Sequence, residues 1–310
     1  MTGRVIAVGG HESDGAAALT GVLGPEVVRV AGGRELVREV RSARADGERV
    51  CVVPMTLGRD PSLVADAART LLALDASERA GTVLAEPFAT TAHLVGWLRT
   101  LATRIPHDRA LLVTAPSGDP FSDADLFRTA RLVRQYGRHR TVEVALLGGD
   151  PGLAEGVRRC RALGAPRVVV LPAAWAVPEP TGVPHTEYGG PLLSGSAAAG
   201  VLASRVREAQ DRYERSGDDG VARALAADHD HGHAHSHGPD GHDHGHDHGH
   251  DHGHGHGHSH GHGDSHGAGP DPGGGHHHGT PSHAPRAGAE PPVRHQGAAP
   301  DLVPSHRSPR

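Results

Sequence analysis

The sequence of 310 residues contains no lysine, only two cysteines, and few aromatic residues: two Trp, three Tyr and three Phe. It also has no run of 18 or more apolar residues, which excludes a membrane span of ordinary length. Residues 1–10 lack the charged start and the long apolar run of a signal peptide. We therefore expect a cytoplasmic protein without a membrane segment.

The scarce residue types also exclude several kinds of site. Cys51 and Cys160 lie in apolar stretches without CxxC spacing, which predicts buried, unpaired thiols. The glycine-rich turn over residues 9–15 fits neither GxGxxG nor GxxxxGK[ST], and the chain has no lysine for the second motif, so no nucleotide is expected. All 31 basic residues are arginines scattered along the chain, and we predict no nucleic-acid surface.

Histidine, in contrast, is abundant: of 28 histidines, 23 lie from His229 onward, whereas every aromatic residue precedes residue 214. A segment without large apolar side chains cannot offset the entropy lost on folding. The sequence therefore predicts a folded part followed by a disordered tail. From Asp228 on, 4 Arg and 10 acidic residues give a net charge of −6, which leaves +1 for the part before it.

The tail alternates histidine with aspartate and glycine, a pattern typical of exchangeable sites for divalent metals. The predicted ligands in its central repeat are His242, His244, His246, His248, His250 and His252. We expect several metal ions to bind near about pH 7.5 and most to leave near about pH 5, as the imidazoles become protonated. A low-complexity linker without ligands and an expression tag are the alternatives.

The folded part alternates short apolar runs with amphipathic segments, which predicts an α/β fold with mostly parallel sheets flanked by helices. The expected strands cover residues 4–8, 27–30, 49–53, 82–85, 110–113, 141–146 and 167–171. The expected helices between them cover residues 34–45, 62–74, 90–103, 123–136 and 151–163.

An internal repeat divides this part into two similar halves, because residues 49–54 (RVCVVP) match residues 167–172 (RVVVLP). We predict a four-stranded lobe over residues 1–105, a second over 106–215, and the tail over 216–310. A helix over residues 196–213 is expected to close the second lobe. Chance similarity between two α/β halves is the alternative to duplication, and a homodimer stays open.

Three stretches resemble a known family. Residues 5–14 (VIAVGGHESD), residues 52–58 (VVPMTLG) and residues 155–172 (EGVRRCRALGAPRVVVLP) are similar to parts of the CbiX-type sirohydrochlorin chelatases, in their two-lobed form. The resemblance covers most of residues 4–210. It implies ATP-independent insertion of Co²⁺, or of Fe²⁺ or Ni²⁺, into a tetrapyrrole in cobalamin or siroheme synthesis. It also implies that His11, which matches the family's catalytic histidine, carries the reaction.

The sequence departs from the family pattern at the same turns. Glu12 and Asp14 stand where the family has glycine and arginine, and the family's second histidine has no counterpart before Asp60. Acidic residues in turns usually make local hydrogen bonds, which is the role we expect for these three. A metal-storage protein or metallochaperone for nickel or cobalt, on a degenerate chelatase scaffold, is therefore the alternative function.

Five side chains are the candidates for the site. His11 is the predicted base and transient metal ligand, because a neutral imidazole both accepts protons and binds first-row metals. Glu86 could supply a carboxylate beside it, or a charge near the next helix. His93 is a further candidate ligand, although its position in the helix favours a packed or surface histidine. Arg59 and Thr114 are the candidate contacts to the tetrapyrrole.

Overall fold

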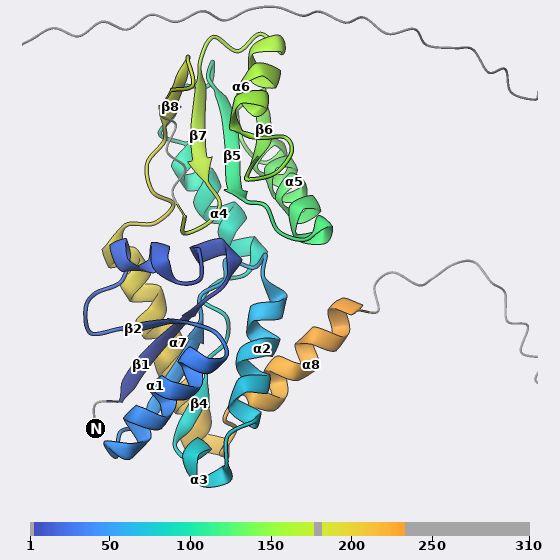
Figure 1. Ribbon diagram of the computed structural model, residues 1–310. Helices are drawn as coiled ribbons and strands as arrows, with labels where there is room; N and C mark the ends of the chain where they lie inside the picture. Colours follow the sequence, from blue (N-terminus) through green and yellow to red (C-terminus); the bar gives the residue numbers. More distant parts are fainter. Residues whose placement is uncertain (1–2, 177–181, 233–310) are drawn as a thin grey trace, which may run out of the picture. The chain divides into compact units, whose positions relative to one another are not determined.

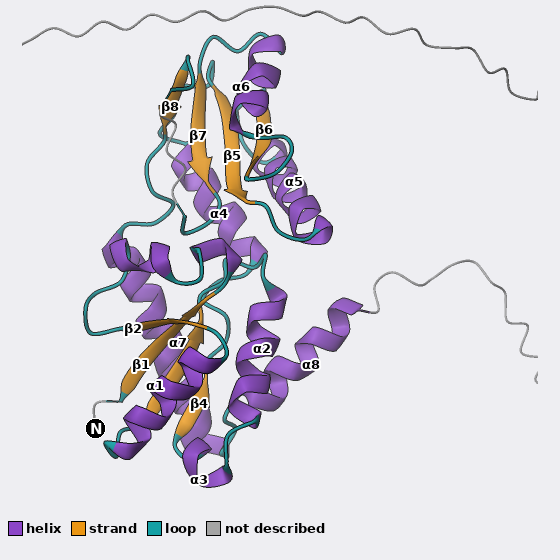
Figure 2. Ribbon diagram, in the orientation of Figure 1, coloured by secondary structure: helices purple, strands orange, loops and turns teal. Residues whose placement is uncertain are grey.

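The computed structural model describes residues 3–176 and 182–232. It contains two parallel four-stranded sheets with helices against them (Figures 1 and 2). The first sheet consists of β1 (Arg4–Gly9), β2 (Val28–Ala31), β3 (Val50–Pro54) and β4 (Thr82–Leu84). The second consists of β5 (Ala110–Pro116), β6 (Val142–Leu147), β7 (Val168–Pro172) and β8 (Thr186–Tyr188). The predicted fold class is confirmed.

The helices have the following bounds. Those within the stretch of the first sheet are α1 (Arg34–Ala45), α2 (Pro61–Leu72) and the short α3 (Ala76–Arg79). The others are α4 (Thr91–Ala102), α5 (Pro120–Gln135), α6 (Leu153–Ala162), α7 (Gly195–Ser216) and α8 (Val221–Gly232). The turn after β1 forms the 3-10 segments η1 (His11–Ser13) and η2 (Ala17–Gly21).

The two sheets have the same strand order, β2-β1-β3-β4 in the first and β6-β5-β7-β8 in the second. The matching segments of the internal repeat form β3 and β7, which occupy the same position in their sheets and are buried along their whole length. Strands buried on both faces read as continuous apolar runs, which is why both are visible in the sequence. The short strand β8 is mostly exposed and does not stand out there.

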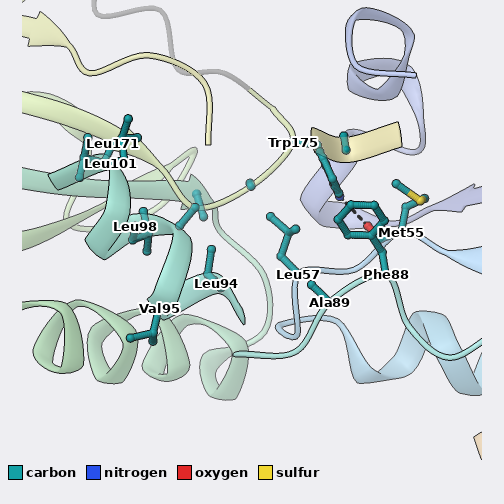
Figure 3. Packing of buried hydrophobic residues seen from close by; sticks show 14 of the residues in the cluster. Met55, Leu57, Phe88, Ala89, Leu94, Val95, Leu98, Leu101, Leu171 and Trp175 are labelled. Atoms are coloured by element: carbon teal, nitrogen blue, oxygen red, sulfur yellow. Dashed lines mark hydrogen bonds between the residues drawn. The ribbon is translucent and has the colours of Figure 1, made fainter. Parts of the chain in front are cut away.

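The helices are exchanged between the two sheets. α4 follows the first sheet in the chain but packs against α5, and its Leu101 lies beside Leu171 of β7 (Figures 1 and 3). α7 follows the second sheet but packs against β3 and β4 of the first. The prediction that this helix closes the second lobe is therefore wrong, because amphipathic spacing shows that a helix has an apolar face and not which sheet covers it.

One apolar core accordingly extends through both sheets. It contains Ala7 and Cys51 from the first sheet together with Leu111 and Leu171 from the second. Two smaller cores lie on the opposite faces, one beneath α1 and α2 and one beneath α6. All described residues belong to one compact unit of the chain.

Several further predictions can be compared with the structure. Cys51 and Cys160 are buried and unpaired, as predicted, and burial raises the pKa of each thiol to about 12. α8 packs against α2, so helical structure continues beyond residue 216, where the tail was expected to begin. No helix in the described ranges is both long enough and apolar enough to cross a membrane.

Candidate functional site

The strand order of each sheet creates a point where ligands commonly bind. The chain leaves β1 toward β2 on one side and enters β3 on the other, so the loops after β1 and β3 diverge at the carboxyl end of the sheet. His11 lies in the loop after β1, and Asp60 closes the loop after β3. The order of the first sheet therefore brings these two side chains to one place.

His11 and Asp60 form a pair. Nδ1 of His11 lies 2.9 Å from Oδ2 of Asp60, and the backbone N–H of His11 donates to the same oxygen at 3.3 Å. The histidine side chain is 27% exposed and the aspartate side chain 6%. Nε2 of His11 is buried and has no hydrogen-bond partner in the described part of the chain. The imidazole is thus held at one nitrogen and unpaired at the other.

The local sequence explains why Asp60 has a fixed position. It is the N-cap of α2: its Oδ1 accepts from the backbone N–H of Leu63 at 3.0 Å and from Oγ of Ser62 at 2.8 Å. Pro61 occupies the first helical turn, where its missing N–H costs nothing. A Cβ atom at Gly10 would lie 2.2 Å from Oδ2 of Asp60, so only glycine lets the backbone before His11 come this close.

The pair also sets the protonation of the imidazole. The hydrogen bond to Asp60 raises the pKa of His11 above its usual 6.5, and this outweighs burial, which lowers it. Burial raises the pKa of Asp60, but the hydrogen bonds from His11 and Ser62 lower it by a larger amount, so the net shift is downward. Asp60 is therefore ionised at neutral pH, and a growing fraction of His11 becomes neutral as the pH rises above 6.5.

A second acid, Glu12, is buried directly behind this pair and is only 1% exposed. Its Oε2 accepts from the hydroxyl of Thr56 and from the backbone N–H of Leu57, while Oε1 has no partner in the described part of the chain. Burial raises the pKa of Glu12, and the hydrogen bonds and the nearby Arg59 charge oppose that shift. This carboxyl therefore joins the loops after β1 and β3 and is not accessible to a ligand.

The second sheet supplies the other wall of the site. The backbone N–H of Trp175, in the loop after β7, donates to the carbonyl of Glu12 at 2.9 Å, and its indole Nε1 donates to the carbonyl of Met55 at 2.7 Å (Figure 3). The indole ring meets Phe88 edge to face, with centroids 4.9 Å apart. After β5, a Cβ atom at Gly118 would lie 3.5 Å from Nε2 of His11. The free nitrogen of His11 thus faces the backbone of the second sheet's loop.

Asp60 also lines a pocket of about 370 Å³. The loop after β3 contributes Thr56 and Gly58 to it, and α5 contributes Asp125 and Arg128. The Arg128 side chain is 71% exposed and lies 3.6 Å from Asp125, one helical turn away on the same face. This pocket therefore places a basic side chain, Arg128, in the same cavity as Asp60.

Arg59 and Thr114 are not placed to bind a substrate. The Arg59 side chain is fully buried and donates to the carbonyl of Ser122 at 3.1 Å, because it crosses from the loop after β3 to the start of α5. Thr114 is also fully buried, and its hydroxyl donates to the carbonyl of Leu171 inside the second sheet. Both residues were predicted as substrate contacts because they lie near the end of a strand. A shift of one or two positions along the chain decides whether a side chain there points into the core.

Glu86 and His93 do not join His11 either. Glu86 forms ion pairs with Arg212 of α7 at 3.6 Å and with Arg223 of α8 at 3.0 Å. His93 accepts a hydrogen bond from the backbone N–H of Thr90 at the start of α4 and stacks on Trp97. Glu86 pairs with α7, which was expected to pack on the second lobe, and with α8, which was not predicted. His93 caps its own helix. The predicted tail ligands, His242 to His252, lie outside the described residues.

Sequence reasoning missed the roles of Asp60 and Trp175. Asp60 makes the local hydrogen bonds expected of a turn acid, but it also holds His11. Its signal was the Asp-Pro pair before a helix, which marks an N-cap but does not reveal its distant partner. The described residues contain no group of three or more His, Cys, Asp or Glu side chains that could enclose a metal ion.

Comparison with known proteins gives one sequence match and several distant structural likenesses. A 67-residue segment, 21% of the chain, is 39% identical to sirohydrochlorin cobaltochelatase from Priestia megaterium, and it spans 22% of that relative's length. The resemblance to sirohydrochlorin chelatases expected from the sequence is confirmed in this segment. No protein family model matches the chain.

Two of the similar solved structures are chelatases from Bacillus subtilis. The sirohydrochlorin chelatase SirB from subspecies spizizenii, in complex with cobalt, is 18% identical with a TM-score of 0.42, over 71% of this chain and 100% of that one. SirB with Fe³⁺ is 15% identical with a TM-score of 0.42, over 70% of this chain and 100% of that one.

Proposed function

We propose that the chain inserts a divalent metal ion, Co²⁺ before Fe²⁺ or Ni²⁺, into sirohydrochlorin or a related tetrapyrrole without using ATP. The observation that carries the proposal is the His11–Asp60 pair at the strand ends, with Nε2 of the imidazole left without a partner. The matched segment of a cobaltochelatase supports the choice of substrate. Cobalt would place the reaction in cobalamin synthesis and iron in siroheme synthesis, in the cytoplasm.

Metal insertion into a tetrapyrrole requires a base and a weak metal ligand. Two pyrrole N–H protons must leave the macrocycle, and the metal ion must shed water before the ring nitrogens enclose it. Neutral His11 has a lone pair on Nε2 for either task, because its proton is held on Nδ1 by Asp60. A carboxylate behind a histidine in this way fixes the tautomer and makes the free nitrogen a better base and ligand.

The small number of protein ligands favours transfer over storage at this site. His11 offers one imidazole, and the described residues provide no cluster of three ligands around it. A stable structural site usually needs four protein ligands, and a catalytic one three. A metal ion held by one imidazole and water can pass to the four nitrogens of the macrocycle, which bind it far more tightly.

Arg128 replaces Arg59 as the proposed contact to the acidic groups of the substrate. It lines the pocket that Asp60 also lines, and most of its side chain is exposed. Guanidinium groups bind carboxylates through two parallel hydrogen bonds. Because about 370 Å³ is near the lower end of ligand pockets, we expect one edge of the macrocycle to enter it and the rest to lie at its mouth.

The decisive experiment follows the absorption spectrum of sirohydrochlorin in the presence of Co²⁺. The purified chain should accelerate the spectral change over the uncatalysed reaction, and His11→Ala should remove most of that acceleration. Fe²⁺ and Ni²⁺ tested in the same way rank the metals. If the wild-type chain and His11→Ala both match the uncatalysed rate, the chelatase proposal is wrong.

The alternative is a protein that stores or delivers nickel or cobalt without catalysis. The observation that favours it is the sequence after residue 228, with its 23 histidines. Storage predicts many bound metal ions and no acceleration of insertion, whereas the chelatase proposal predicts acceleration whatever the stoichiometry. The same purified chain, assayed for both properties, separates the two functions.

A further inference from the structure

Two adjoining pockets lie near the amino ends of the strands of the second sheet, whereas the His11 site lies at carboxyl ends. One, of about 620 Å³, lies between the last turns of α4 and α5, and the other, of about 1000 Å³, lies beside the starts of β5 and β6. His107 and His139 line both. These cavities have no place in the proposed reaction.

The walls of the two pockets are strongly basic. Six arginines line them: Arg99, Arg109, Arg131, Arg134, Arg138 and Arg140. The acidic residues in the same walls are Asp108 and Glu143. The chain as a whole has a net charge of −5, so this gathering of positive charge is a local property, produced by four separate segments that the fold brings together.

Most of this charge is not neutralised within the described ranges. Arg109 forms an ion pair with Glu187 at 2.7 Å, and the Arg99 guanidinium lies 5.7 Å from the ring centroid of Tyr136. The other four arginines (Arg131, Arg134, Arg138 and Arg140) have no carboxylate within 4 Å in those ranges.

Favourable helix ends explain part of the arrangement. Arg99 and Arg134 lie in the last turns of α4 and α5, where a positive charge interacts well with the helix dipole. Arg138 and Arg140 follow α5 and are not part of its last turn. Like charges gathered around a concave surface repel one another and attract anions, and walls of low dielectric constant strengthen that attraction.

His139 provides a separate indication of a ligand. It is only 5% exposed, and its Nε2 has no hydrogen-bond partner in the described residues. Its ring meets that of His107 edge to face, with centroids 5.4 Å apart. A buried polar atom without a partner is costly, and this one belongs to the wall that the two pockets share.

We propose that these pockets bind a small molecule with two or more carboxylate or phosphate groups. Arginine guanidinium groups from both pockets would hold the anionic groups, because their planar fork matches both carboxylate and phosphate oxygens. His139 would complete the contacts from the common wall. The volumes lie in the usual range for small-molecule sites. The site is separate from the His11 pair, and the proposal does not depend on chelatase activity.

Isothermal titration of the full chain, stripped of metal, tests the proposal. Citrate and tripolyphosphate serve as the carboxylate and phosphate probes at constant ionic strength. The variant Arg134→Gln/Arg138→Gln removes one positive charge from each pocket. Arg207→Gln/Arg215→Gln is the matched control, because it removes the same charge from exposed positions on α7.

We expect saturable binding of at least one probe, weakened about tenfold or more in the pocket variant and less than twofold in the control. The preferred probe identifies the ligand class. His139→Gln should also weaken binding while leaving the salt dependence unchanged. Equal affinity in both double variants, or no saturable binding of either probe, would overturn the proposal.

Discussion

The two sheets have the same strand order and the same place for a site, but among the described residues the first sheet has an imidazole after its first strand and the second has a serine. Val8 pairs with Pro54 in the first sheet, and Thr114 pairs with Pro172 in the second, so these two pairs are equivalent. Three residues further along, His11 therefore corresponds to Ser117. Thr114 itself corresponds to Val8, and both lie inside a central strand, which is why Thr114 is buried.

The second site keeps a similar pattern of hydrogen bonds without the imidazole. The hydroxyl of Ser117 donates to Oδ2 of Asp123 at 2.9 Å, and the backbone N–H of Gly118 donates to Oδ1. In the first sheet, the backbone N–H and Nδ1 of His11 both meet Oδ2 of Asp60, but Asp60 follows β3, whereas Asp123 lies on α5 after β5. Both turns therefore meet a carboxylate, although the two carboxylates stand at non-equivalent positions of the repeat, and one side chain decides whether the turn can bind a metal.

The largest expected effect concerns the union of the two sheets. Leu98 of α4 is fully buried in the core that both sheets share, so Leu98→Ala should lower the free energy of unfolding by about 2–5 kcal/mol. Because α4 and α7 are exchanged, we expect one unfolding transition by circular dichroism and tryptophan fluorescence. Leu163→Ala, at a site 63% exposed, should change little. Two separate transitions, with only one shifted, would show that the sheets unfold independently.

The second prediction compares the equivalent residues of the two sites. His11→Ala should slow metal insertion about 100-fold or more, because it removes the proposed base and ligand. Ser117→Ala should reduce the rate less than twofold. Initial rates of the spectral change with Co²⁺ measure both. Comparable losses in the two variants would contradict the assignment of chemistry to the first sheet.

The third prediction concerns pH. The wild-type insertion rate should rise through a midpoint above 6.5, because the raised pKa of His11 keeps it protonated below that point. Asp60→Asn should move the midpoint to lower pH and reduce the limiting rate about tenfold. Stability follows the opposite course: while Asp60 stays ionised, the pair stabilises the folded chain fully below 6.5, and this contribution disappears as the pH rises through the folded-state pKa of His11. An unchanged midpoint in Asp60→Asn argues against the coupling.

A smaller effect should separate binding from turnover. Arg128→Gln should raise the KM for sirohydrochlorin a few-fold at constant kcat, because Arg128 is proposed to contact its carboxylates. Arg207→Gln, at an exposed position of α7 outside all the pockets named above, is the control. Quenching of tryptophan fluorescence measures tetrapyrrole binding without metal. If the two variants have the same affinity, Arg128 is not a substrate contact.

The smallest effect on insertion should come from removing residues 233–310. At saturating Co²⁺ the rate should stay within twofold of the full chain, because His11 and Asp60 lie outside that segment. The number of metal ions bound at about pH 7.5 should fall to near zero, since the removed segment contains 21 of the 28 histidines. Equal metal stoichiometry in both proteins would contradict the predicted role of the tail.

Periodicity alone predicted most of the architecture. Buried strands such as β3 and β7 are continuous apolar runs, and α1 begins and ends where its amphipathic pattern does. β8 was not assigned because a three-residue, mostly exposed strand has no pattern of its own. The exchange of α4 and α7 could not be predicted either, since both sheets offer an apolar face of the same kind.

For the site, the sequence by itself determined that His11 follows an apolar strand and that 23 of the 28 histidines gather after residue 228. Tertiary structure decided the partner of His11: the strand order brings Asp60 to it across 49 residues, and Gly10 permits the close approach. It also assigned Glu86 to the arginines of α7 and α8 and buried Arg59. Local patterns record which face of an element is apolar, whereas the contacts of a polar side chain depend on segments far away in the chain.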